Sequence, residues 1–172
     1  VDMRIISEIL GNLKSRDFVS KEVDFFDLEW FETTKKILRK NTRNGDDVAV
    51  RILKEKFRIK HLDIFFEDDS KVIVANVLPA DAAVVKPATM REMGTICYEI
   101  GNQHIPIFIE NDEIIIPFED PIYNLLQKSG YSPLKEKRIF ENMLKAAPVH
   151  TVENTVKIDM DSFFSKVLPN KK

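Results

Sequence analysis

The sequence predicts an α+β protein made of two successive domains. Strand-like segments separated by turn signals fill the first half of the chain, and no convincing helix interrupts them. In the second half the hydrophobic period changes, and segments with helical spacing alternate with apolar strands. Residues 35–60 carry ten basic and three acidic side chains, whereas residues 61–120 carry three basic and twelve acidic ones. The simplest interpretation of this asymmetry is two solvated surfaces of opposite sign.

The overall composition is that of a folded protein without a strong electrostatic preference. The 172 residues are 44% hydrophobic, which is enough apolar material for a core, and the net charge of −2 favours neither nucleic acid nor membrane surfaces. The single cysteine excludes a disulfide framework and a cysteine-rich zinc module. No apolar run nears the roughly 20 residues of a membrane span, and no secretory signal opens the sequence. We therefore expect a cytoplasmic protein.

A hairpin is the clearest element of the first half. Asn44-Gly45 lies between the strand-like residues 36–40 and 47–52. This dipeptide is typical of a type I′ turn, in which both central residues have positive φ. Residues 36–40 alternate poorly between apolar and polar side chains, so the turn is the stronger of the two signals.

Two further segments complete the predicted all-β domain. A second hairpin is expected to join residues 63–66 to residues 72–75. Residues 27–32 alternate as a strand would, and the side chains that share one of its faces are Leu28, Trp30 and Glu32. Nothing in this domain resembles a catalytic constellation.

The first predicted helix has clear signals at both ends. Thr89 and Glu92 have the spacing of a capping box, and Gly101 is placed to be the residue that follows the helix end. The apolar side chains between them recur at helical spacing. They are Met90, Met93, Ile96, Cys97 and Ile100.

Two strands and a second helix follow. Residues 105–109 and 113–116 are apolar and flank a polar turn. Asp120 is expected as the N-cap of the second helix and Pro121 as its first residue, and Gly130 ends it.

The order of these elements predicts a ferredoxin-like domain. Counting residues 71–77 as the first strand and residues 137–144 as the last gives the order βαββαβ. We accordingly place the all-β domain at residues 1–70, the ferredoxin-like domain at residues 71–147 and a flexible tail at residues 148–172.

His104 is the best-placed of three histidines for chemistry. It directly follows the predicted end of the first helix, where a neutral imidazole is available to a metal. One imidazole holds a transition metal poorly, but a two-fold interface would bring two copies of His104 together, with His150 as a further donor from the tail. Taken alone, His104 is better explained as an ordinary surface histidine, and for His61 that interpretation is strongly preferred.

The remaining reactive groups have simpler explanations. Cys97 lies on the apolar face of its helix and is predicted to be a buried structural thiol. The acidic side chains of residues 110–120 are expected to be a solvated turn and a helix cap. The sequence has no Gly-x-Ser-x-Gly, no phosphate-binding glycine loop and no His-Glu-x-x-His, so we nominate no catalytic residue.

Two motifs resemble a known family. Residues 23–33 are VDFFDLEWFET and are followed by Lys35 and Lys36, while residues 96–104 are ICYEIGNQH. These stretches resemble the "DLEWFET…KK" segment and the "YEIGNRH" signature of UreE, the nickel chaperone family of urease, in its Helicobacter-like branch. The likeness extends over most of the chain, although Gln103 stands where the signature has arginine.

The resemblance implies a non-enzymatic, homodimeric metallochaperone that delivers Ni²⁺ to apo-urease together with the accessory GTPase UreG. It implies an N-terminal peptide-binding domain and a ferredoxin-like metal-binding domain. His104 corresponds to the metal-binding histidine at the dimer interface, and His150 to the C-terminal histidine that completes the site. Imidazole ligands also suit Zn²⁺ and Cu²⁺.

Two alternatives from other classes remain at this stage. One is a small metal- or phosphate-dependent hydrolase on a ferredoxin-like module. The other is an adaptor in which the basic residues 35–60 dock an acidic protein and metal binding is incidental.

Overall fold

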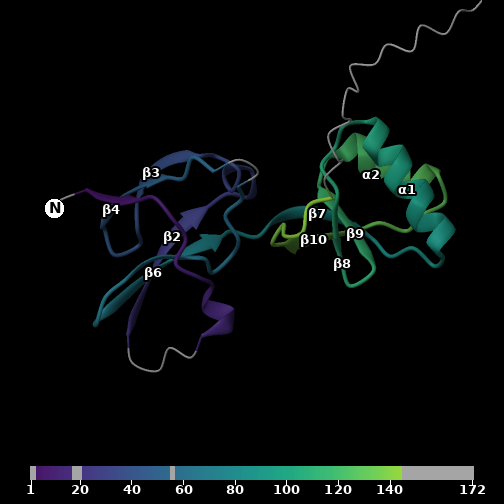
Figure 1. The fold of residues 1–172 in the computed structure, drawn as a ribbon. Coiled ribbons are helices and arrows are strands. Elements are labelled where there is room, and N and C mark those ends of the chain that lie inside the picture. Colours follow the sequence, from purple (N-terminus) through teal and green to yellow (C-terminus); the bar gives the residue numbers. More distant parts are fainter. Residues whose placement is uncertain (1–2, 17–20, 55–56, 145–172) are drawn as a thin grey trace, which may run out of the picture.

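The computed structural model describes residues 3–16, 21–54 and 57–144, which form two units joined by one short connection (Figure 1). The first unit contains strands only, apart from two 3₁₀ turns, and the second combines strands with two helices. This is the α+β architecture that the sequence predicts. The predicted tail, residues 148–172, lies outside the described residues.

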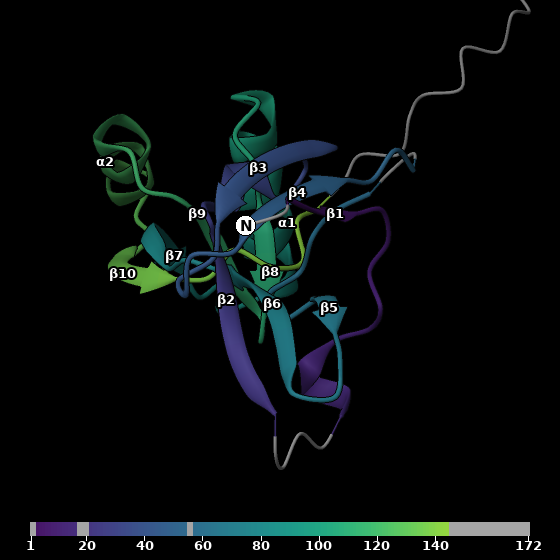
Figure 2. The same ribbon diagram turned by 90° about the vertical axis from the view of Figure 1, so that its left-hand side faces the viewer.

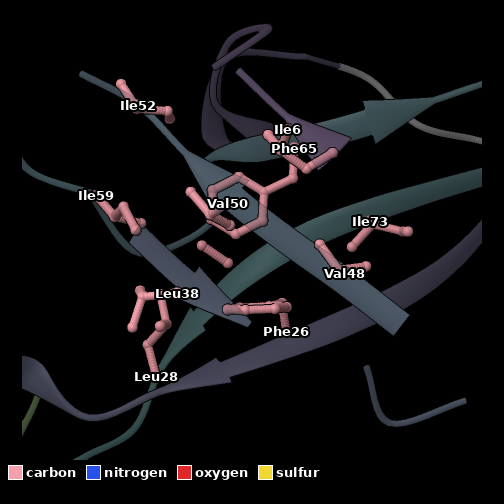
Figure 3. Close-up of a cluster of buried hydrophobic side chains, with 11 residues drawn as sticks. Ile6, Phe26, Leu28, Leu38, Val48, Val50, Ile52, Ile59, Phe65 and Ile73 are labelled. Atoms are coloured by element: carbon pink, nitrogen blue, oxygen red, sulfur yellow. The ribbon is translucent and has the colours of Figure 1, made fainter. Parts of the chain in front are cut away.

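The first unit consists of two three-stranded sheets packed face to face. One sheet has the order β1 (Arg4–Ile6), β4 (Asp47–Arg51), β3 (Ile37–Asn41). The other has the order β2 (Glu22–Leu28), β6 (Lys71–Val77), β5 (Ile64–Glu67). The strands of the two sheets cross steeply in Figure 2. Alternate side chains point between the sheets, so Val48 and Val50 meet Phe26 and Phe65 in the core shown in Figure 3.

The predicted hairpin of β3 and β4 is confirmed, but its type I′ turn is wrong. The register pairs Asn41 with Asp47, which leaves five residues in the connection. Only Gly45 of the predicted pair has positive φ, at 93°. The Oγ1 of Thr42 accepts a hydrogen bond from the Asp46 backbone N–H at 3.0 Å, and this contact closes the longer loop. The second predicted hairpin, β5 with β6, is also confirmed.

The strand predicted over residues 27–32 ends early. β2 stops at Leu28, and Trp30–Glu32 form a 3₁₀ turn, labelled η2. The Glu29 backbone N–H donates to Oε2 of Glu32 at 3.0 Å, so this carboxylate caps the turn that replaces the strand. Because the chain leaves the sheet here, Trp30 no longer follows the alternation of β2.

The predicted first strand of the ferredoxin-like unit is wrong. Residues 71–77 are β6, which pairs in parallel with β2 and antiparallel with β5. The first strand of the second unit is instead β7 (Ala80–Val85). Both strands are apolar and only two residues separate them, so the pattern could not assign them to different sheets. Because β6 is a central strand buried on both faces, its side chains do not alternate between apolar and polar. The sequence pattern therefore does not indicate which strands it pairs with.

The second unit has the predicted ferredoxin-like topology. Its elements are β7, α1 (Met90–Asn102), β8 (Phe108–Glu110), β9 (Glu113–Pro117), α2 (Asp120–Lys128) and β10 (Leu134–Arg138). The antiparallel sheet has the order β10-β7-β9-β8, in which the first and third strands are central. The last strand begins and ends earlier than the predicted 137–144, and Glu119 rather than Asp120 is the N-cap of α2.

Alternation along the sheet separates two layers of this unit. Ile114 and Ile116 of β9 face α1 and α2 and pack against Ile96, while Ile115 between them points to the opposite face. The helices therefore cover one side of the sheet (Figure 1). In the described part of the chain, neither helix is long and apolar enough to span a membrane.

An aromatic cluster on the opposite face joins the two units. Trp30 of the first unit packs edge-on against Phe108 and Phe140 of the second, with ring centroids 6.1 and 5.3 Å apart. The rings of Phe108 and Phe140 are 4.8 Å apart. Arg58 of the first unit adds a cation–π contact at 5.2 Å from the Phe108 centroid.

Replacing Phe140 by alanine should therefore weaken both the second unit and its contact with the first. Phe140 is fully buried, and truncation of such a ring costs about 3–5 kcal/mol of unfolding free energy. Trp30 is the only tryptophan, so its emission should shift to the red as its ring gains water. Urea denaturation followed by fluorescence measures both effects. Phe31→Ala is the control, because Phe31 contacts the same indole but is 54% exposed; an equal loss in both variants would contradict the role of the cluster.

Candidate metal centre

The helix that precedes His104 is fixed at its start by a local cap. Thr89 has extended backbone angles, and its Oγ1 accepts a hydrogen bond from the Glu92 backbone N–H at 3.1 Å. The Glu92 carboxylate in turn accepts from the Ala88 N–H at 2.7 Å. The predicted Thr89 cap is therefore confirmed, whereas the Glu92 carboxylate binds the residue before the N-cap and not the Thr89 N–H that a capping box requires.

The inner face of α1 is anchored in the core of the second unit. Ile96 and Ile100 are completely buried against the sheet, and Met93 and Cys97 are partly buried beside them. Met90, predicted on the same face, is instead 91% exposed, because it lies at the first residue of the helix beyond the edge of the sheet contact. The buried isoleucines leave the C-terminal end of the helix little freedom to move.

The chain reverses at His104 rather than at the predicted Gly101. The helix continues through Gly101 to Asn102, with Gln103 as C-cap. His104 has a φ of 58°, in the left-handed region that non-glycine residues adopt at some cost, and its backbone N–H donates to the Gly101 carbonyl at 3.0 Å. Ile107 then returns to the core. His104 is thus held between two buried isoleucines, while its side chain is exposed.

The described part of one chain supplies His104 with no set of further metal ligands. Among these residues no group of three histidine, cysteine, aspartate or glutamate side chains is close enough to hold an ion. Cys97 is half-buried, and burial raises the pKa of its thiol, which disfavours the thiolate that metals bind. The predicted structural role of Cys97 agrees with this setting. His150 lies outside the described residues.

The acidic residues 110–120 lie at a turn and a helix start, as expected, and Glu113 is in addition paired. Glu113 accepts a hydrogen bond from Arg138 at 2.8 Å, and Asp120 lies in the first turn of α2. Asn111 and Asp112 both have positive φ, at 48° and 63°, and connect β8 to β9. The type I′ geometry predicted for the first hairpin thus occurs in this one.

His61 lies at the junction of the two units and not beside His104 at the end of α1. Its Nδ1 accepts a hydrogen bond from the Val77 backbone N–H at 3.2 Å, at the last residue of β6. Burial lowers the pKa of His61, with Lys14 adding to this effect and Glu141 opposing it. The interpretation of His61 as an ordinary surface residue missed this contact, since only the tertiary fold brings residue 61 to residue 77.

The chain is similar to known proteins over most of its length. The family model described as "UreE urease accessory protein, N-terminal domain" matches residues 6–78, and the corresponding C-terminal domain model matches residues 80–159. The curated urease accessory protein UreE of Flavobacterium johnsoniae is 44% identical over 164 residues, covering 95% of this chain and 97% of that protein. The UreE of Actinobacillus pleuropneumoniae is 39% identical over 146 residues, covering 83% and 78%. That of Helicobacter hepaticus is 30% identical over 169 residues, covering 96% and 97%.

The left-handed backbone at His104 predicts an unusual order of stability among variants. His104→Gly should be more stable than His104→Ala by about 1 kcal/mol, because alanine keeps the steric cost of positive φ and glycine removes it. Urea denaturation at neutral pH with a chelator present measures the difference. Gln103 is the matched control, since its φ is −85° and alanine should there be the more stable substitution. The same order at both positions would contradict a left-handed His104.

His61 predicts a pH dependence of folding stability. Because its folded-state pKa lies below the ordinary value of 6.5, the unfolded chain takes up a proton first as the pH falls. Its contribution is therefore fully present above pH 6.5 and is lost as the pH drops from 6.5 towards the folded-state pKa. Comparing urea denaturation at pH 7.5 and 5.5, the native protein should lose more stability than His61→Gln, which does not titrate. Equal losses would contradict the buried neutral ring.

Proposed function

Because the chain belongs to the UreE family of urease accessory proteins, we propose that it carries Ni²⁺ and delivers it to apo-urease during assembly of the enzyme's active site. As an accessory protein it assists an enzyme and is not one itself. The observation that carries the proposal is His104, an exposed imidazole on a backbone fixed by buried neighbours. A carrier needs such a ligand, which is held in place yet open to a receiving protein.

We further propose that a homodimer completes the site. Transition metals in proteins are held by several nitrogen, sulfur or oxygen donors, and His104 is one donor. A two-fold interface places identical residues opposite each other, so pairing through this end of the second unit would supply two imidazoles from two chains. The dimer would then bind one Ni²⁺ between its subunits, and the same donors would also accept Zn²⁺ or Cu²⁺.

His150 is proposed as the additional donor. The described chain ends at Leu144, whose backbone N–H donates to the Ile107 carbonyl at 2.7 Å. Ile107 is only three residues from His104, so residue 144 is tethered near the proposed site. Six further residues reach His150, and an extended chain of that length spans up to about 20 Å. This length supports the proposal that His150 joins His104 as a ligand.

A site of few imidazoles suits transfer rather than storage. Each ligand can be replaced singly by one from a receiving protein, so the metal need never be free in solution. We propose that the receiving partners are the accessory GTPase UreG and the apo-urease activation complex, and that transfer takes place in the cytoplasm. The family membership of the chain supports these assignments.

Calorimetric titration with Ni²⁺ tests the proposed site. The native protein should bind about one Ni²⁺ per dimer, with the dimer mass established by light scattering. His104→Ala should abolish this binding, because the two central donors are lost, and His150→Ala should weaken it by about tenfold or more. His61→Ala serves as the matched control and should bind Ni²⁺ as the native protein does.

Two results would contradict the proposal. Unchanged affinity in His104→Ala would exclude this residue as a ligand. One independent Ni²⁺ per monomer would exclude a site shared across the two-fold axis.

A further inference from the structure

A deep cleft separates the two units at the aromatic junction. Its volume is about 980 Å³, at the upper end of the roughly 300–1,000 Å³ typical of ligand pockets. The first unit lines it with residues from the segment 8–14 and with residues 52, 54, 57–61, 63 and 77, and the second unit lines it with residues 140–143. His104 does not line it.

The wall formed by the first unit has an excess of unpaired positive charge. Lys14 pairs with Glu141 at 3.3 Å. Asp63 is satisfied at 2.7 Å by the backbone N–H of Lys60 and at 3.0 Å by the amide of Asn12. Within the described residues, no carboxylate lies within 4 Å of the charged groups of the remaining lining cations, which are Lys54, Arg58 and Lys60. Glu8 is the one lining acid without a partner there, and it is exposed.

Arg58 is the most unusual of these cations. Its Nη1 is buried and has no hydrogen-bond partner in the described part of the chain, although the guanidinium rests on the Phe108 ring. Burial also lowers the pKa of Arg58, which reflects the desolvation of its charge. Nη1 itself is shielded from the cleft, but Arg58 is one of the lining residues, and a carboxylate is the partner whose geometry best matches a guanidinium.

Most of the remaining lining is apolar, and Gly11, His61 and Asn142 complete it. The apolar part includes aromatic, aliphatic and methionine side chains from both units, namely Ile9, Ile52, Phe57, Ile59, Val77, Phe140 and Met143. A bare inorganic anion would leave this surface uncovered, because the cleft is far larger than such an ion. The cations are spread along residues 54–60, so an occupant that presents several carboxylates along its length fits better than one with a single charge.

We propose that this cleft binds an extended acidic segment of a partner protein, with apolar side chains against the floor and a carboxylate on Arg58. Alternating acidic and apolar residues would meet the cationic wall and the apolar floor together. The inference does not depend on the proposed nickel function, since the cleft and His104 share no residue. The junction of the two units is then a docking site for a protein of complementary charge.

An amide-shift titration tests the cleft directly. The probe is acetyl-(Leu-Glu)₃-amide, added to ¹⁵N-labelled full-length protein, with acetyl-(Leu-Gln)₃-amide as its uncharged match. The acidic peptide should shift amides around the cleft, such as those of Asn12, His61 and Glu141, and the uncharged peptide should bind far more weakly. No binding by either peptide, or equal binding by both, would overturn the proposal. Displacement of the peptide by an equal concentration of citrate would also overturn the proposal, because the cleft would then be a site for a small carboxylate and not for a protein segment.

Three variants identify the residue that receives the carboxylate. Arg58→Gln should lower peptide affinity about tenfold or more, since a charge-assisted pair is lost. Arg51→Gln removes the same charge from the exposed side of β4, outside the cleft lining, and should change affinity less than about twofold. Lys54→Gln, at an exposed cleft position, should weaken binding with no effect on packing. Equal effects of Arg58→Gln and Arg51→Gln on peptide affinity, or unchanged affinity in Lys54→Gln, would overturn the assignment. All three variants should bind Ni²⁺ as the native protein does, because the cleft and the metal site are separate.

Discussion

The contact of Trp30 with Phe108 and Phe140 is the interaction on which the relation between the two units depends. Only Leu78 and Pro79 connect β6 to β7, so the covalent link holds the units close together, and side-chain contacts between them stabilise one orientation. The aromatic rings supply a large apolar contact with preferred edge-on geometry. This contact exists because the 3₁₀ turn after β2 removes Trp30 from its strand and points it at the second unit. The cleft and its cationic wall follow from the same arrangement.

The alternation of β9 keeps the two candidate sites apart. Ile114 and Ile116 face the helices and stabilise the end of α1, where His104 lies. Ile115 faces the aromatic cluster that borders the cleft. Because successive side chains of a strand point to opposite faces, a single strand supports both regions without placing them in one pocket. The proposed metal and the proposed partner would therefore meet different faces of the molecule.

The sequence predicts elements whose causes are local and fails where distant contacts decide. The capped helix before His104 and the βαββαβ order depend on residues a few positions apart, and both are found. The assignment of residues 71–77 to the sheet of the second unit is wrong, because two neighbouring apolar strands look alike until their partners are known. His104 could be singled out by its place after a helix. Its positive φ could not be predicted, because the nearby Gly101 is the residue type that usually adopts this conformation at a helix end. Arg58 belongs to the basic residues 35–60 that the sequence marks out, but nothing in the sequence distinguishes it among them or brings it to Phe108.

One segment connects the two regions physically. Residues 140–143 form the far wall of the cleft, and the next residue, Leu144, is hydrogen-bonded to Ile107 close after His104. Met143 also bridges to Phe108, so this segment is held by backbone contacts to the strand that follows His104. The point from which the chain continues towards His150 is therefore set by the same residues that border the cleft. A partner bound against residues 140–143 would lie beside the start of the segment that carries the additional proposed ligand, which gives docking and metal transfer a common structural basis.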